Sequence, residues 1–207
     1  MNKENVIVNR LEFISGNTTC VGYLYHMKSD APRPCIVMGS GFGGTQDTPS
    51  MIAVATALAQ AGFHAFTFDY RNLGESDGQP RQLVSIDGQQ EDFLSAISFI
   101  KKQPAVDEKA LGIWGSSLGG GHVISVAAKE KDLSVVIAQI PFNGFPKKNG
   151  RSLWDTLKLL HVMIKDKNRG KKGLPPLYIP AVGKTGEIAV MVGEEVTNTI
   201  SDMQTKT

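Results

Sequence analysis

The sequence has few of the features that mark secreted, membrane-bound or nucleic-acid-binding proteins. Only two cysteines, Cys20 and Cys35, occur in 207 residues, which excludes a disulfide framework and a cysteine-based metal site. The formal net charge of +2 argues against a nucleic-acid partner. The N-terminus, Met-Asn-Lys-Glu-Asn, begins no apolar signal segment, and no apolar run is long enough to cross a bilayer. We therefore expect a cytoplasmic protein that needs no metal and acts neither on membranes nor on nucleic acids.

The apolar residues are arranged as alternating strands and helices. Hydrophobic residues make up 41% of the chain, enough for one domain with an insertion. After a hairpin that turns around Gly16, strand-like and helix-like segments alternate. The expected strands include 35–38, 64–68 and 134–140, and the expected helices cover about 49–60 and 85–102. This alternation predicts an α/β protein with a mainly parallel sheet covered by helices on both faces.

The pattern changes after Pro141. Ser152 precedes a helix-like segment as a capping residue, with Leu157, Leu160 and Ile164 on one face. A basic stretch, 165–172, follows; we interpret it as a solvated loop, with a site for acidic substrates as the alternative. Residues 1–141 are therefore the expected core, and 142–207 a lid-like insertion and tail.

The most informative segment is Gly115-Ser-Ser117-Leu-Gly119, a G-x-S-x-G pattern between an apolar run and a helix-like run. In a nucleophile elbow the serine lies on a sharp, strained strand-to-helix turn, and small residues must flank it. The turn exposes the Ser117 hydroxyl. It also directs the Leu118 N–H and the helix N-terminus toward the place where negative charge develops. The alternative is a glycine-rich turn that only packs a helix against a sheet.

These residues resemble the α/β-hydrolase superfamily over about residues 10 to 145. Three signatures occur in the family's order: Gly39-Ser-Gly-Phe-Gly-Gly44, the loop Asp69–Gly78, and the elbow. Three shorter segments are similar to a subgroup of polyketide transferases and thiohydrolases: Gln79–Leu83, Gly120–Val123 and Gln139–Phe142. Similar proteins also include dienelactone-hydrolase-like and X-Pro-peptidase-like enzymes. The resemblance implies an α/β-hydrolase sheet and a nucleophilic Ser117.

The resemblance also implies how an oxyanion is held. One N–H donor is that of Leu118, the residue after the nucleophile, and the second comes from the loop after the third strand. By match to the family's His-Gly-Phe-Gly-Gly loop, the second donor is Phe42, with Ser40 in place of the usual histidine.

The polar loop after the fourth strand is expected to be structural. Asp69 and Arg71 would hold loops together by hydrogen bonds, with direct substrate contact as the alternative. Arg81 would be solvated or would pair with a loop, and a contact with a substrate carboxylate is its alternative.

A general base for Ser117 is difficult to find. In this fold the chain order is Ser, then Asp or Glu, then His, and only His122 and His161 follow Ser117. We expect His122 to pack inside the fold or to support the site indirectly. His26 and His64, which lie in or beside strands, are expected to have structural roles only. His161 could act with Asp155 or Asp166 only if one short helix supplied both partners. We therefore expect no histidine within reach of Ser117, and a chain that stops at its sixth strand with an apolar sheet edge. A truncated product, a fragment, or a subunit completed by another chain would each explain this.

The sequence therefore predicts a serine hydrolase or acyltransferase that acts on a small ester or thioester through an acyl-Ser117 intermediate. Phe42 and Leu118 would bind the oxyanion, and no metal or organic cofactor is needed. Homo-oligomerisation is left open. One alternative is a catalytically incomplete α/β-hydrolase-like protein that binds a small ligand or partner, and another is an unstable product of a once-active gene.

Overall fold

A computed structural model gives the structure of the chain and describes residues 6–144, 152–184 and 186–192. The described residues form two compact units, one that ends at Asn143 and one that begins at Gly144. The lid-like role expected for residues 142–207 stays a prediction.

The first unit contains a six-stranded sheet in the order β1-β2-β4-β3-β5-β6. Its strands are β1 (Ile7–Ser15), β2 (Thr18–His26), β3 (Arg33–Gly39), β4 (His64–Phe68), β5 (Val106–Ser116) and β6 (Val135–Gln139). β2 pairs antiparallel with both β1 and β4, and the pairs β3–β4, β3–β5 and β5–β6 are parallel. The predicted mainly parallel sheet is confirmed.

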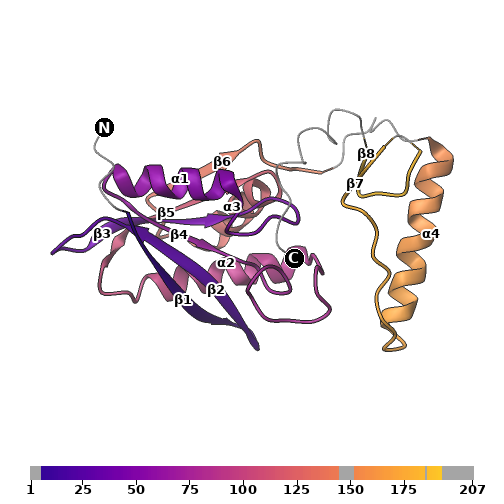
Figure 1. The fold of residues 1–207 in the computed structure, drawn as a ribbon, viewed down its shortest axis with the longest axis horizontal. Coiled ribbons are helices and arrows are strands. Elements are labelled where there is room, and N and C mark those ends of the chain that lie inside the picture. The colour runs from indigo at the N-terminus through magenta and orange to yellow at the C-terminus, as the bar shows by residue number, and fades with distance from the viewer. Residues whose placement is uncertain (1–5, 145–151, 185, 193–207) are drawn as a thin grey trace. The chain divides into compact units, whose positions relative to one another are not determined.

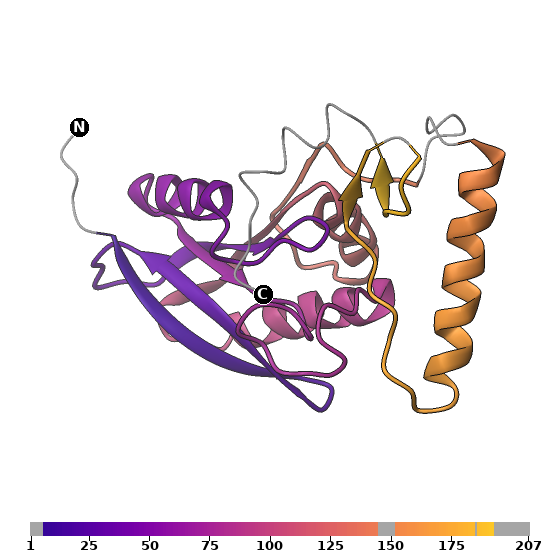
Figure 2. The same ribbon diagram turned by 45° about the vertical axis from the view of Figure 1, so that its right-hand side comes forward.

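Helices cover both faces of this sheet (Figure 1). α1 (Pro49–Gln60) packs on one face through Met51, Ala55 and Ala59. α2 (Ile86–Ile100) and α3 (Leu118–Lys129) lie on the other face, where they share a buried cluster with the sheet. Figure 2 shows the same two layers after rotation. The α/β-hydrolase type of architecture therefore has a core on each side of the sheet.

The edge strand β6 is exposed. Among the described residues it pairs only with β5. Val135, Val136 and Ile137 are 42%, 41% and 38% exposed. The sixth strand is thus an apolar sheet edge, as the sequence predicts; unpaired strand edges of this kind are prone to pair with other strands.

The second unit contains α4 (Leu153–Gly170) and a short parallel pair, β7 (Val182–Gly183) with β8 (Met191–Val192). The predicted N-cap is confirmed, since the Ser152 hydroxyl accepts a hydrogen bond from the Asp155 N–H at 3.1 Å. The prediction of a loop over 165–172 is wrong, because α4 continues to Gly170. The physical reason is that Lys and Arg are good helix formers that favour the carbonyl end of a helix.

Candidate functional site

Ser117 lies at the junction between β5 and α3, at the carboxyl end of the parallel strands. β5 ends at Ser116 and α3 begins at Leu118, so a single residue makes the turn. Its backbone dihedrals are φ 54° and ψ −117°, a region that residues with a side chain rarely occupy. Strained backbone of this type persists only where the surrounding structure enforces it. The predicted tight, strained strand-to-helix turn is confirmed.

Three backbone hydrogen bonds hold the strained turn. The Ser117 N–H donates to the Gln139 carbonyl at 3.0 Å, at the end of β6. The Ser117 carbonyl accepts from the N–H groups of Gly121, at 3.0 Å, and of Phe142, at 2.8 Å. The turn is therefore fixed to its own helix and to the chain that leaves the edge strand.

The glycines that flank Ser117 are required by close backbone approach. A Cβ at Gly115 would overlap the backbone of Gly119, and a Cβ at Gly119 would overlap the carbonyl of Ser40. At this point strand β5, helix α3 and the loop after β3 are too close together for any side chain. The glycine spacing of the motif thus lets the three backbones converge around Ser117.

The glycine-rich loop after β3 lies directly against Ser117. A Cβ built on Gly41 would be 3.3 Å from the Ser117 Cβ and 4.0 Å from its Oγ. The Ser40 hydroxyl donates to the Gly44 carbonyl at 2.7 Å and is buried. The serine found where the family usually has histidine therefore closes the loop on itself.

Phe42 lies at the tip of this loop, between Gly41 and Gly43, whose φ is +66°. Within residues 6–144 the Phe42 N–H has no backbone acceptor. Leu118 is the first residue of α3, so its N–H has no carbonyl partner within the helix. Two N–H groups from segments that border Ser117 are thus left without backbone partners, as an oxyanion site requires.

The Asp69 carboxylate holds the chain that follows the glycine-rich loop. Its Oδ1 accepts from the Gln46 N–H at 2.7 Å and its Oδ2 from the Glu75 N–H at 2.9 Å. Burial raises the pKa of this carboxyl to about 6, against the two backbone hydrogen bonds that lower it. The structural role predicted for Asp69 is confirmed, since its carboxylate joins the chain after the glycine-rich loop to the loop 69–78.

Arg71 also has the predicted loop-holding role. Its Nε donates to Asp92 Oδ1 at 2.7 Å and its backbone N–H to Asp92 Oδ2 at 2.9 Å. The same guanidinium contacts Ser15 and Glu91. The Asp92 side chain is fully buried, so this arginine neutralises a carboxylate inside the fold.

Arg81 pairs with a loop rather than standing free. Its two terminal nitrogens donate to the carbonyls of Ser76 and Gly74. The loop-pairing interpretation is the one the structure supports.

His122 lies behind the elbow rather than beside its hydroxyl. The ring is 1% exposed, and Nε2 lies 2.8 Å from Gln89 Oε1. Its other face meets the ring of Tyr70 edge-on at 5.8 Å. Burial lowers the pKa of His122 to about 4, so the imidazole is neutral at pH 7. The contact with Gln89, which connects α3 to α2, was not predicted; the sequence offers no periodic signal for a pair 33 residues apart.

The two histidines that precede Ser117 lie at the other end of the sheet. His64 opens β4 and pairs in register with Cys35, whereas Gly115 pairs with Gly39 at the carboxyl end. The His26 ring meets that of His64 at 5.3 Å. Within the first unit, therefore, no described histidine is placed to take the Ser117 proton.

His161 belongs to the second unit. It lies on α4, whereas the Asp155 carboxylate is held by the Ser152 hydroxyl at 2.7 Å and by Lys158 at 3.3 Å. The residues of α4 therefore do not form an acid–histidine pair between Asp155 and His161, and Asp166 accepts from the Leu177 N–H.

Across the described part of the chain, no three His, Cys, Asp or Glu side chains gather as a set of metal ligands. The same residues include no helix that is long and apolar enough to cross a membrane. Cys20 and Cys35 are free thiols, and both are fully buried.

Comparison with known proteins identifies the family. The model of the family described as serine aminopeptidase, S33, matches residues 30–170. The chain belongs to this family of α/β-hydrolases. The crystal structure of the α/β-hydrolase GrgF from Penicillium sp. sh18 has the same fold, with a TM-score of 0.80 at 24% identity over 94% of this chain and 66% of that one.

Two curated relatives are similar over most of this chain. Quorum-quenching protein AidA of Acinetobacter baumannii (strain MDR-ZJ06) is 37% identical over 182 residues, which are 87% of this chain and 60% of that protein. Thiohydrolase apmlB of Arthrinium phaeospermum is 32% identical over 176 residues, which are 82% of this chain and 53% of that protein. The chain thus spans between half and two thirds of the length of these relatives.

Proposed function

We propose that the chain carries the nucleophile and oxyanion half of a serine hydrolase or acyltransferase that acts on small esters or thioesters. The observation that supports this most is the strained backbone of Ser117 between β5 and α3, because strain of this kind concentrates at functional sites. A cytoplasmic location and a small-molecule substrate are part of this proposal.

The proposed reaction begins with attack of the Ser117 Oγ on the acyl carbonyl carbon. The carbonyl oxygen then carries the negative charge, and the N–H groups of Phe42 and Leu118 stabilise it; each such donor contributes roughly 10²–10³ in rate. The hydroxyl proton passes to a base, which returns it to the departing alcohol or thiol. Water or a second nucleophile then takes the acyl group from Ser117.

The base must lie outside the first unit, because His122, His26 and His64 are held elsewhere in it. His161 in the second unit is one candidate. A group from a further polypeptide is the other. The chain covers only part of its relatives' length. The proposal for this chain therefore concerns the nucleophile and not the activity of a whole protein.

The thioester is the better supported substrate class. A thiohydrolase is 32% identical to this chain, and polyketide transferase ATR5 of Stachybotrys chlorohalonatus is also 32% identical, over 172 residues. The alternative is a non-catalytic protein that binds a ligand at the same elbow; the absence of an imidazole beside Ser117 in the first unit favours it.

The test is rescue by an external base. The purified chain is mixed with p-nitrophenyl acetate, with and without added imidazole, and Ser117→Ala and Ser116→Ala are run in parallel. Imidazole should accelerate hydrolysis by the native chain and by Ser116→Ala beyond the rate that imidazole gives with Ser117→Ala. Equal rates for all three proteins would support the binding protein. Rapid turnover without imidazole that is lost in His161→Ala would identify His161 as the base.

A further inference from the structure

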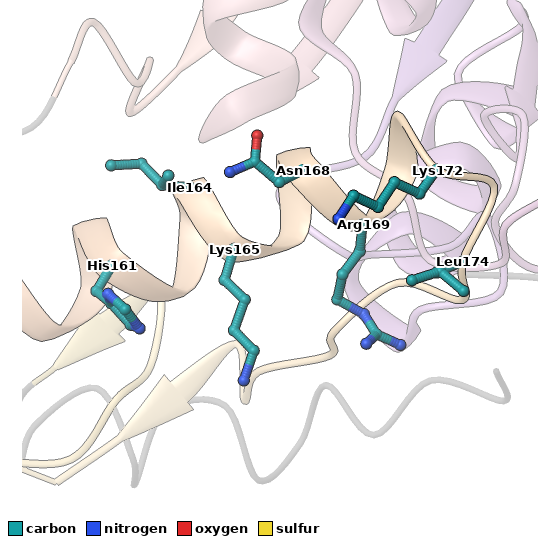
Figure 3. Close-up of a pocket in the computed structure, with 7 residues that line it drawn as sticks. All are labelled: His161, Ile164, Lys165, Asn168, Arg169, Lys172 and Leu174. Carbon is teal, nitrogen blue, oxygen red and sulfur yellow. The ribbon is translucent and has the colours of Figure 1, made fainter.

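The second unit contains an open groove of about 430 Å³ along the last turns of α4 and the turn that follows. Figure 3 shows the side chains that line it. Lys165, Arg169 and Lys172 supply the charge, and Ile164 and Leu174 supply apolar surface. No carboxylate is among the lining residues, so every formal charge around the groove is positive.

Local backbone structure brings the cations together. Lys165 and Arg169 are four residues apart and extend from the same side of α4 (Figure 3). The chain then reverses, since the Leu174 N–H donates to the Arg169 carbonyl at 3.1 Å. This reversal returns Lys172 and Leu174 to the groove. The Arg169 Nε donates to the Pro175 carbonyl at 3.0 Å, which fixes the guanidinium at the rim.

The cations of the groove have no acidic partner in the described part of the unit. Asp166 accepts from the Leu177 N–H at 2.7 Å, on the side where the chain returns. The Asp155 carboxylate accepts hydrogen bonds from the Ser152 hydroxyl and from the Lys158 ammonium group. Like charges four residues apart on a helix repel each other, so the pair Lys165–Arg169 is stabilised when an anion lies between them.

The helix dipole alone does not account for this arrangement. It favours cations anywhere in the last turn, and Lys167 and Lys171 satisfy that preference outside the groove. The dipole does not require that three other cations line one concave surface together with apolar side chains. That combination suits an anion attached to an organic group.

We propose that this groove binds the phosphate groups of a phosphorylated thiol carrier of the coenzyme A type. The inference rests on the proposed thioester chemistry at Ser117. Lys and Arg form charge-assisted hydrogen bonds with phosphate oxygens, and Ile164 and Leu174 offer apolar surface to the rest of the carrier. The groove would thus recognise the carrier of a thioester rather than its acyl group.

Calorimetric titration of the 207-residue chain with coenzyme A at low ionic strength tests the proposal. Binding should weaken at least tenfold in Lys165→Glu and in Arg169→Glu. The matched control is Lys167→Glu, which makes the same charge change on the same helix outside the groove and should bind as the native chain does. An equal loss in Lys167→Glu, or no loss in the groove variants, would overturn the proposal.

Two further ligands test whether phosphate is the group that the groove recognises. Inorganic pyrophosphate should compete with coenzyme A, and pantetheine, which lacks phosphate, should not bind. Pantetheine binding as tight as that of coenzyme A would overturn the assignment. Because Arg169 also holds the turn, circular dichroism is used to check that its variant is folded. Lys165→Gln, which removes the positive charge without adding a negative one, should also weaken binding.

The two proposals fail separately. p-Nitrophenyl acetate has no phosphate, so Ser117-dependent reaction with it does not need the groove. Ser117-dependent reaction without coenzyme A binding would leave the proposed function in place and remove the carrier site. Coenzyme A binding without any reaction at Ser117 would retain the site and remove the proposed nucleophile.

Discussion

The Ser117 N–H donates a hydrogen bond to the carbonyl of Gln139 at 3.0 Å. The strained elbow is therefore anchored to the last residue of β6, the exposed edge strand of the main sheet. The Phe142 N–H, three residues further on, reaches the Ser117 carbonyl. The geometry of Ser117 thus depends on an edge strand that, among the described residues, pairs with one other strand.

Substitution of Gly119 by alanine should destabilise the first unit. The new Cβ would overlap the Ser40 carbonyl, a backbone atom that cannot rotate away. Overpacking of this kind costs about 1–3 kcal/mol, which urea denaturation measures. Gly170→Ala is the control, since nothing lies within 4 Å of the Cβ it adds, and its unfolding midpoint should not fall. Equal midpoints for Gly119→Ala and the native chain would show that the three backbones do not meet as described.

The elements that sequence reasoning located well have strong local signals. α1 has the predicted bounds because Pro49 favours its first turn and Gly62, with φ +92°, ends the segment after it. Ser152 caps α4 as predicted, and Ser85, where the second helix was expected to begin, is the N-cap of α2. β1 begins at Ile7, and the polar residues Asn9, Arg10 and Glu12 conceal this strand in the sequence.

The features that were missed have an ambiguous local signal or none. The prediction of a loop over 165–172 is wrong because its charged residues, which are typical of loops, also favour the end of a helix. The strands β7 and β8 have two residues each, too few for any periodicity. Ser117 was located from its glycines, but its anchoring to Gln139 requires knowing that β6 lies beside β5.

Loss of the Arg71 guanidinium should destabilise the fold strongly. Arg71→Gln leaves the fully buried Asp92 carboxylate without its cation, which costs about 3–5 kcal/mol for a buried pair. Arg10→Gln removes an arginine that is exposed and contacts Glu12 and Glu75 on the surface, so its midpoint should stay close to that of the native chain. Thermal unfolding of both variants measures the two midpoints. Similar decreases in the midpoint for Arg71→Gln and Arg10→Gln would contradict the buried pairing of Arg71 with Asp92.

His122 should make stability depend on pH. Its folded pKa is lowered to about 4 from an unfolded value of 6.5, so the unfolded chain binds the proton first. The contribution of His122 to the free energy of unfolding is fully present above pH 6.5. It is lost as pH falls toward 4, and the loss is at most about 3 kcal/mol. Asp69, with a pKa raised to about 6, acts in the opposite direction: its contribution is present below pH 4 and is lost as pH rises through 6.

The His122 contribution is isolated by difference. Free energies of unfolding of the native chain and of His122→Asn are compared at pH 7.5 and pH 4.5. The native chain should lose more stability on acidification than the variant does. The same loss in both proteins would show that His122 titrates as it does in water.

Both thiols should be unreactive in the folded chain. Cys20 and Cys35 are fully buried, and burial raises the pKa of Cys20 to about 12 and that of Cys35 further. Because the thiolate is the reactive form, Ellman's reagent at pH 8 should modify neither cysteine in native buffer and both in denaturant. Rapid modification of the native chain would place a thiol at the surface.

The most direct measurement is the site and rate of fluorophosphonate labelling of the 207-residue chain, followed by intact mass and peptide mapping. Without a base the hydroxyl stays protonated, and only the residual acceleration of an oxyanion site, roughly 10³–10⁴ over water, remains. We therefore predict slow labelling, confined to Ser117, faster with added imidazole and absent in Ser117→Ala. Label on other residues at the same rate in Ser117→Ala would contradict the assignment of Ser117 as the nucleophile.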